Sequence, residues 1–483
     1  MARFVRTRLS GMMFLFFFGI GAWVVTLSTY LMSAPINGGL YFTTVELGWI
    51  YSATALGGMI APLTIGILTD RLFRAERVLG AASLLSAVLL LAAGLVCDEA
   101  QPRMNAAYLE SAASCLVDGR PALEQLDRRH DLHDPHDVEF RNRVRAALDP
   151  VSEDPTVRRI AAETFWPLFA LMFGYSLCMQ LCLTLTTVIG LRNVSDPARD
   201  FSRIRLFGTV GWIASGIAIE AFFRPATTDV FYVGAAGTAL IGLYAFTLPA
   251  TRPLGTGRSA FEAFGLPALK LFKDRSFVVF FVVAFIATAM NQFYVVYAHR
   301  YLKDHDVPAP ALVMTIAQVV EVGCMFALPY LRPKDWMKPL MLFGLAGYAL
   351  RCVVLANGWT PAVIALGVPM HGWGYTFFFL VAATYLDREA PPHLRGSAQG
   401  IITFVSSGIG VLVGNMFSAA VVDRYRQGTI IDWTPVWEVP LVVCSVVLVA
   451  FAVLFQPRGK QESGDRIQET GFRRDRTRQN DPS

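Results

Sequence analysis

Charged residues are scarce in this sequence. Asp, Glu, Lys and Arg make up only 16% of its 483 residues, while hydrophobic residues make up 54%. Soluble domains carry roughly 25% charged residues. The composition therefore predicts an all-α membrane protein that crosses the bilayer many times. The formal net charge of +5 gives no reason to expect a nucleic acid partner, because basic residues at helix ends are typical of membrane topology.

Several motifs that carry chemistry are also missing. The sequence has no CxxC or CxxH cluster, so a structural zinc site is not expected. It has no phosphate-binding loop, so the chain encodes no ATP-driven pump. The predicted spans contain neither a nucleophile–base pair nor a metal quartet. We therefore predict a protein that is not an enzyme and that needs no metal and no cofactor.

Five of the seven cysteines fall inside predicted spans, where they are typical small core residues. The other two, Cys97 and Cys115, flank what we interpret as a polar loop. They could form a disulfide if that side of the membrane is oxidising.

Long apolar runs dominate the rest of the chain. A bilayer-spanning helix needs ~20 such residues, and about twelve stretches qualify. The first run, from Gly11, is too long for a cleavable signal and is better interpreted as the first span. The predicted spans are 11–33, 47–69, 78–97, 164–190, 205–223, 229–249, 276–299, 309–330, 337–357, 361–386, 397–419 and 436–456.

Lys and Arg are unevenly distributed between the two sets of connections. Arg203 and Arg388 are among those that follow even-numbered spans, whereas the connections 34–46 and 358–360 contain none. The positive-inside rule then places both termini in the cytoplasm, and we expect a multi-pass protein of the cytoplasmic (inner) membrane.

Six spans, a link and six more spans form two helical halves, which is the architecture of a major facilitator transporter. The predicted segments are 1–97 and 164–249 for the N-terminal half, 98–163 for a polar extracytoplasmic insertion, 250–275 for a cytoplasmic linker, 276–456 for the C-terminal half and 457–483 for a disordered cytoplasmic tail.

The insertion contains a tract in which histidines alternate with aspartates: His130, His133 and His136 each precede or follow an Asp. Such a tract could hold a divalent metal. We interpret it instead as a solvated face of an extracytoplasmic cap.

An acidic residue near the middle of the eighth span is the main candidate for function. Glu321 lies one helical turn after Gln318, so both side chains share a face. A carboxylate at this depth costs several kcal/mol unless it is protonated or paired. The pair therefore suggests a site that lines a cavity, with a structural Glu paired to a neighbouring helix as the alternative.

Polar side chains on three further spans could face the same cavity. Arg205, Thr209 and Trp212 form one stripe of span five, although Arg205 could equally be a cytoplasmic anchor. Span seven offers the amides of Asn291 and Gln292, which could instead hydrogen-bond between helices. The remaining candidates are His371 and Tyr375, which lie one turn apart on span ten. Arg351 on span nine lies nearer the outer end, and we interpret it as structural, either snorkelling or paired with an acid.

The chain resembles the nucleoside:proton symporters of the major facilitator superfamily, the group of bacterial nucleoside and xanthosine permeases. The resemblance covers almost all twelve spans and fails in 98–163 and the tail. The matching stretches are GAWVVTLSTYL (21–31), GILTDR (66–71), RLFGTVGW (205–212), QVVE (318–321), YALR (348–351), RGSAQG (395–400) and IDWTPVW (431–437).

The resemblance implies a central cavity that binds nucleosides, with protons as the coupling ion and a monomer as the working unit. By match, the substrate-binding residues are Arg205, Thr209, Trp212, Gln292, Gln318, Glu321, His371 and Tyr375.

This sequence also departs from the family pattern at three positions. Thr376 stands where the family can carry an acid, Val295 where it has an Asn, and His371 where it has an aromatic residue, a Tyr. We therefore assign proton coupling to Glu321, with His371 as its partner. Two alternatives remain: a carrier of a sugar or another small polar solute, and a non-transporting membrane sensor that uses the 98–163 insertion.

Overall fold

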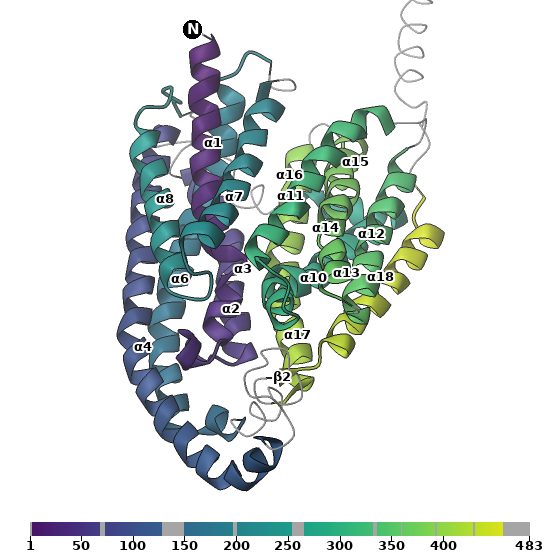
Figure 1. Ribbon diagram of the computed structural model, residues 1–483. Helices are drawn as coiled ribbons and strands as arrows, with labels where there is room; N and C mark the ends of the chain where they lie inside the picture. Colours follow the sequence, from purple (N-terminus) through teal and green to yellow (C-terminus); the bar gives the residue numbers. More distant parts are fainter. Residues whose placement is uncertain are drawn as a thin grey trace, which may run out of the picture.

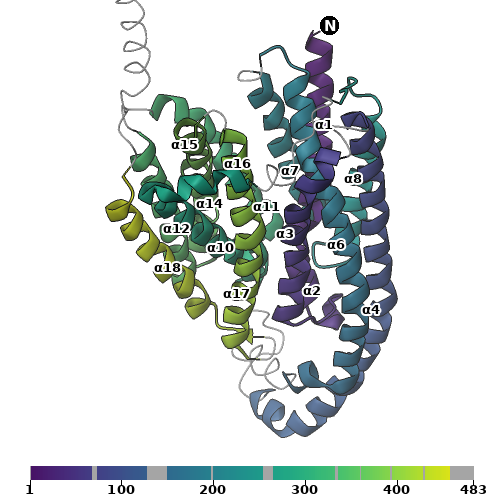
Figure 2. The ribbon, with the colours of Figure 1, turned by 180° about the vertical axis from the view of Figure 1, so that it is seen from behind.

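The computed structural model consists of two bundles of helices that stand side by side (Figures 1 and 2). It describes residues 2–67, 73–127, 149–196, 200–253, 265–331, 336–358, 360–391, 394–427 and 430–456. All twelve predicted spans coincide with helices. Ten of these, within the described part of the chain, are long and apolar enough to cross a membrane; the other two are α3 (Thr44–Ile67) and the shorter apolar helix α8 (Asp229–Ala245). The predicted all-α architecture of about twelve spans is thereby confirmed.

The N-terminal half contains α1 and α2 as a nearly continuous first span, followed by a short 3-10 turn η1 and five further helices. Helix α1 packs against α7 and α8, α4 packs against α6 and α8, and α3 packs against α6. The bounds are α1 Ala2–Val24, α2 Leu27–Met32, η1 Pro35–Asn37, α4 Ala75–Asp127, η3 Asp149–Glu153, α6 Pro155–Arg192 and α7 Ser202–Phe222.

The C-terminal half begins after a 3-10 segment, η5 (Leu266–Lys273), and contains six spans, two of them interrupted. Span ten is built from α13, α14, η7 and α15, and span eleven from α16, η9 and α17; η7 and η9 are π-helical. π-Helical turns inside helices frequently mark functional sites. The bounds are α10 Arg275–Asp304, α11 Pro310–Ala327, η6 Leu328–Leu331, α12 Met337–Asn357, α13 Pro361–Gly367, α14 Met370–Gly374, η7 Tyr375–Leu380, α15 Val381–Glu389, α16 Arg395–Thr403, η9 Phe404–Gly410, α17 Val411–Arg424, β1 Arg426–Gln427, β2 Ile430–Ile431 and α18 Trp433–Leu454.

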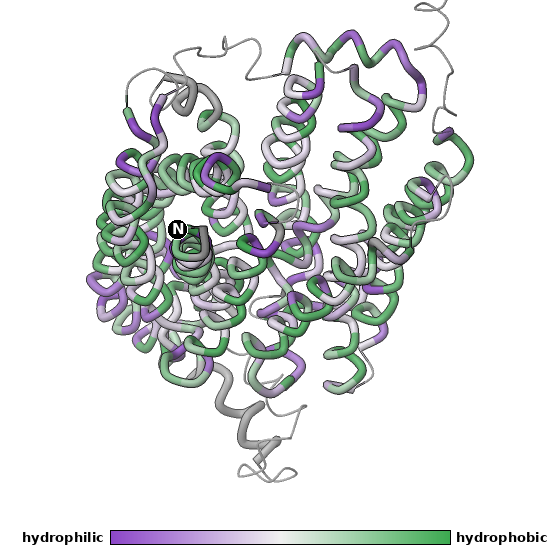
Figure 3. The backbone as a smooth tube through the Cα atoms, turned by 90° about the horizontal axis from the view of Figure 1, so that it is seen from above, coloured by the Kyte–Doolittle hydropathy of each residue, from purple (hydrophilic) through white to green (hydrophobic). Residues whose placement is uncertain are grey.

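Capping residues and first-turn prolines explain where two of these helices begin. Asp274 caps α10, because its side chain accepts hydrogen bonds from the backbone N–H groups of Ser276 and Phe277. Pro310 occupies the first turn of α11, where a missing N–H costs nothing. The tube in Figure 3, viewed from above, is coloured as mostly hydrophobic along the helices, as a membrane bundle requires.

Helix α4 differs from the prediction, because it does not end where the third span ends. It continues from Ala75 to Asp127 as one curved helix, and α6 begins at Pro155, ahead of the fourth span. The described parts of 98–163 are therefore largely extensions of two spans. These extensions contact each other through an ion pair between Arg103 and Glu163 at 2.7 Å. The histidine tract, the tail and much of the 250–275 linker lie outside the described residues.

The suggested disulfide between Cys97 and Cys115 is wrong. Both cysteines lie on α4 and both are free. Eighteen residues of helix separate them by about 27 Å, whereas the Cα atoms of a disulfide lie within about 7 Å.

Candidate substrate cavity

A cavity between the two halves brings together seven of the eight residues predicted for the site. It encloses about 850 Å³ of empty space, including the part open to solvent, and is lined from α1, α7, α10, α11, α14 and η7. The predicted residues on its wall are Arg205, Thr209, Trp212, Gln318, Glu321, His371 and Tyr375. Ligand pockets typically measure about 300–1,000 Å³, so the cavity has room for a small polar molecule.

The N-terminal half supplies a cation, a hydroxyl and an indole from α7. Arg205, Thr209 and Trp212 recur at helical spacing and so face the cavity together. The guanidinium of Arg205 lies 4.2 Å from the ring centroid of Phe17 on α1, a distance typical of a cation–π contact. The aromatic ring therefore holds the cation at the cavity wall.

The C-terminal half supplies the carboxylate and an amide from α11. Glu321 and Gln318 line the cavity, whose wall on the other half carries the cation of Arg205. Thr376 lies behind this pair, fully buried, and its hydroxyl donates to the carbonyl oxygen of Glu321 at 3.3 Å. Thr376 therefore supports the α11 backbone and does not line the cavity.

Helix α14 approaches α11 more closely than a side chain would allow. A Cβ atom on Gly372 would lie 2.1 Å from the carbonyl oxygen of Ala317 and 2.5 Å from the backbone nitrogen of Glu321. Because position 372 is glycine, His371 and Glu321 can line the same cavity from adjacent helices.

Arg351 is the main correction to the sequence-based interpretation. It neither snorkels nor pairs with an acid: it is 1% exposed, and its Nη1 donates to Oδ1 of Asn291 at 3.1 Å and lies 3.0 Å from Nδ1 of His371. The rings of Tyr294 and Tyr348 flank its guanidinium at 4.7 and 4.9 Å. Arg351 thus lies directly behind the cavity wall.

The prediction that Gln292 lines the cavity is wrong for this structure. Gln292 is buried, its amide nitrogen donates to the carbonyl oxygen of Thr288 at 3.2 Å, and its Cγ packs close to Gly414 on α17. Its neighbours Tyr294 and Val295 line the cavity instead. The packing between α10 and α17 therefore holds the Gln292 side chain away from the cavity wall.

The structure adds six residues to the wall that were not predicted for the site. They are apolar or aromatic, and for four of them no signal in the sequence distinguishes them from ordinary core residues. The added residues are Phe17, Val24, Val25, Tyr294, Val295 and Met314. Two had a sequence signal: Tyr294 is one of the polar side chains of span seven, and Val295 stands where the family has an Asn.

Polar contacts between the halves lie towards the end of the bundle opposite the termini. Among the described residues these are Thr29 with His299, Ser52 with Asn415, Thr44 with Asp423 and Glu220 with the backbone nitrogen of Ala311. The cavity is therefore closed towards the opposite end.

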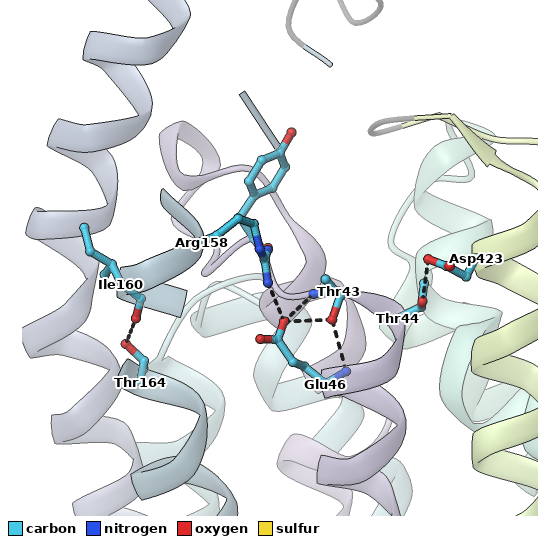
Figure 4. Close-up of polar contacts among 8 residues, drawn as sticks. Thr43, Thr44, Glu46, Arg158, Ile160, Thr164 and Asp423 are labelled. Carbon is cyan, nitrogen blue, oxygen red and sulfur yellow. Dashed lines mark hydrogen bonds and ion pairs between the residues drawn. The ribbon is translucent and has the colours of Figure 1, made fainter. Parts of the chain in front are cut away.

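The extension of α6 supports this closure (Figure 4). Arg158 donates to the carboxylate of Glu46 at 2.9 Å and to the carbonyl oxygen of Tyr41 at 3.1 Å. The same carboxylate oxygen accepts a hydrogen bond from the hydroxyl of Thr43. The next residue, Thr44, donates a hydrogen bond to Asp423 of the other half at 3.0 Å. The extension thus holds the loop that carries the closing contact.

Two six-helix halves with a polar cavity between them define a secondary transporter of the major facilitator type. Sequence comparison then identifies the branch. The chain belongs to the nucleoside H+ symporter family, which it matches over residues 4–110 and 157–460. The gap in the match, 111–156, lies inside the predicted insertion.

Individual relatives agree with this assignment, and a solved structure shows the same fold. The chain is 30% identical over 468 residues to the putative nucleoside transporter YegT of Escherichia coli (strain K12), covering 93% of each protein. It is 26% identical over 455 residues to the xanthosine permease of the same organism, covering 90% of this chain and 92% of the permease. The crystal structure of the nucleoside transporter NupG superimposes with a TM-score of 0.71 at 22% identity, covering 94% of this chain and all of that one.

Proposed function

We propose that this protein imports nucleosides across the cytoplasmic membrane together with protons, by alternating access. One observation carries the proposal: residues from both halves converge on one cavity with a carboxylate, a cation, amide and hydroxyl groups and aromatic rings. Amides and carboxylates can hydrogen-bond ribose hydroxyls and base edges, and Trp212 and Tyr375 offer faces on which a base can stack.

Glu321 is the proposed proton carrier. Among the described residues it is the only carboxylate that lines the cavity, and the opposite charge of Arg205, on the wall of the other half, favours its ionised form. Protonation removes that attraction and leaves the Arg205 guanidinium available to the substrate. Release of the proton on the other side of the membrane restores the attraction between Glu321 and Arg205. Proton and substrate then move together, and no cofactor is required beyond the proton gradient.

His371 is a poorer proton carrier than the sequence suggested. Its Nδ1 already faces the guanidinium of Arg351 at 3.0 Å. A second positive charge at that distance is unfavourable in a membrane interior. We therefore assign the proton to Glu321 alone and a hydrogen-bonding role to His371.

The proposed orientation follows from the distribution of Lys and Arg, which favours cytoplasmic termini. The closed end then faces outward, and the structure corresponds to a state open to the cytoplasm. Opening the outer end requires the four polar contacts between the halves to break. We propose that a monomer suffices, because one chain encloses the whole cavity.

The test is uptake of labelled uridine and adenosine into proteoliposomes, with and without an inward proton gradient. We expect uptake that the gradient stimulates and that a protonophore abolishes. Uptake indifferent to the gradient would contradict proton symport. Absence of uptake, with folding and orientation verified, would contradict the nucleoside assignment and favour a sugar or another polar solute. Binding to a 98–163 fragment without uptake would favour a sensor.

A further inference from the structure

A buried arginine without a carboxylate partner lies behind the cavity wall. None of the ion pairs formed by the described residues includes Arg351. Its Nη1 is instead directed at Oδ1 of Asn291 and at Nδ1 of His371. A buried charge in a membrane protein is retained at a cost of several kcal/mol. This suggests that the contact with His371 has a use.

The guanidinium dictates which nitrogen of His371 carries the proton. Arginine has only N–H donors and stays charged in proteins. At 3.0 Å, Nδ1 of His371 must therefore accept the hydrogen bond, and the proton of the neutral imidazole must sit on Nε2. Arg351 thus removes the alternative tautomer, in which Nδ1 would be the donor.

Aromatic rings hold both partners in this arrangement. The imidazole of His371 stacks on Tyr294 with centroids 4.5 Å apart and an interplanar angle of 14°. Tyr294 also contacts the guanidinium of Arg351, with Tyr348 at a similar distance. The imidazole cannot rotate without losing the stacking contact and the hydrogen bond together. Its direction is therefore fixed along with its tautomer.

His371 is also one of the residues that line the cavity, so its Nε2–H is the polar group it can offer a substrate. Elsewhere on the wall, the amide and hydroxyl groups can donate or accept and the carboxylate accepts, while Arg205 and Trp212 only donate from the other half. We propose that Arg351 is a positioning residue that makes His371 a donor only, and that this donor selects nucleosides with an oxo group, not an amino group, on the base edge. The inference rests on the proposed function.

The expected selectivity follows from the cost of placing the Nε2–H donor of His371 against an amino group of the base, which is also a donor. A site built to hydrogen-bond one group rejects an analogue that leaves its buried donor unpaired. That penalty corresponds to roughly 10- to 100-fold in affinity. We expect inosine to compete for uptake better than adenosine by about this factor, and uridine better than cytidine.

The experiment compares these four nucleosides as competitors in wild type and variants. His371→Gln supplies an amide that can turn to donate or accept, so the oxo preference should fall to within about threefold. Arg351→Met should have the same effect, because His371 can then change tautomer. Arg351→Lys keeps a charged donor for Nδ1 and should retain the preference. Arg224→Met, at a side chain 79% exposed on the other half, is the control.

A second measurement keeps the inference testable if Arg351→Met transports poorly. NMR of protein labelled with 15N-histidine, with His371→Gln identifying the signal, should show a proton on Nε2 and none on Nδ1 in wild type. A proton on Nδ1 overturns the inference, as does uptake without oxo preference in wild type or an unchanged preference in both His371→Gln and Arg351→Met. Absence of uptake for all four nucleosides overturns the proposed function, while the NMR result still tests the tautomer.

Discussion

Replacing Gly372 with alanine should disable the cavity with little change in its chemistry. The new methyl carbon would lie 2.1 Å from the carbonyl oxygen of Ala317 and 2.5 Å from the nitrogen of Glu321, whereas ordinary contacts begin near 3.4 Å. Both clashing atoms belong to backbone, so no side chain can turn aside. Helices α14 and α11 must separate by at least about 1 Å, because protein interiors are too closely packed to absorb the overlap.

That separation displaces Glu321 and Gln318 relative to His371. A misplacement of about 1 Å in a binding constellation costs on the order of 100-fold in rate, and overpacking costs about 1–3 kcal/mol of stability. We therefore expect Gly372→Ala to lower the uptake rate about 100-fold while the protein still folds. The assays are nucleoside uptake in proteoliposomes and thermal unfolding in detergent.

Gly323 provides a matched control on α11 itself. A Cβ atom at this position meets nothing within 4 Å. Gly323→Ala should leave uptake unchanged and raise stability by up to about 1 kcal/mol, because alanine favours the helix. Normal uptake by Gly372→Ala, or equal losses in the two variants, would refute the reasoning.

Three further predictions follow from the site. Glu321→Gln should abolish stimulation by the proton gradient but keep nucleoside exchange within about tenfold, since the amide can still hydrogen-bond but cannot titrate; stimulated uptake in this variant would contradict the role of Glu321. Gln318→Ala should raise the KM for uptake about tenfold through lost hydrogen bonds, whereas Gln292→Ala should leave KM unchanged and lower the melting temperature; equal KM effects would contradict the geometry. Asp423→Ala should weaken the closed end by about 1.5–3 kcal/mol, because it removes the hydrogen bond from Thr44. A cysteine introduced by Thr209→Cys on the cavity wall should then be alkylated faster by an impermeant reagent added outside; an unchanged rate would show that the contact does not hold that end closed.

The span pattern could be predicted from the sequence because a bilayer imposes one length and one composition on every crossing helix. The face shared by Gln318 and Glu321, and the stripe of Arg205, Thr209 and Trp212, were likewise predictable from helical spacing, and these residues meet at one cavity. Spacing along one helix specifies which side chains point together. It does not specify which neighbour they meet.

That limit explains the errors. Gln292 was placed on the cavity by match to the family and because an amide suits a polar solute, but the packing of α10 directs it towards α17. Arg351 was placed near the outer surface from its position along the span, and only packing reveals its contacts with Asn291 and His371. The extension of α4 past Cys97 was missed because hydropathy measures membrane depth, although the Ala, Leu, Glu and Gln residues that follow favour helix.

Because α4 is one continuous helix, its projecting part must move together with the N-terminal half. Its 53 residues measure about 80 Å along the helix, against a hydrocarbon core of about 30 Å. The projecting part is continuous with a span of the N-terminal half, and α6 accompanies it through the Arg103–Glu163 ion pair. Any rotation of that half about the cavity therefore moves the projecting part of α4 over a longer arc than it moves the residues that line the cavity. Two distance labels, one on the projecting part of α4 and one on the C-terminal half, would therefore report the transport cycle as a large change in distance that can be measured outside the membrane.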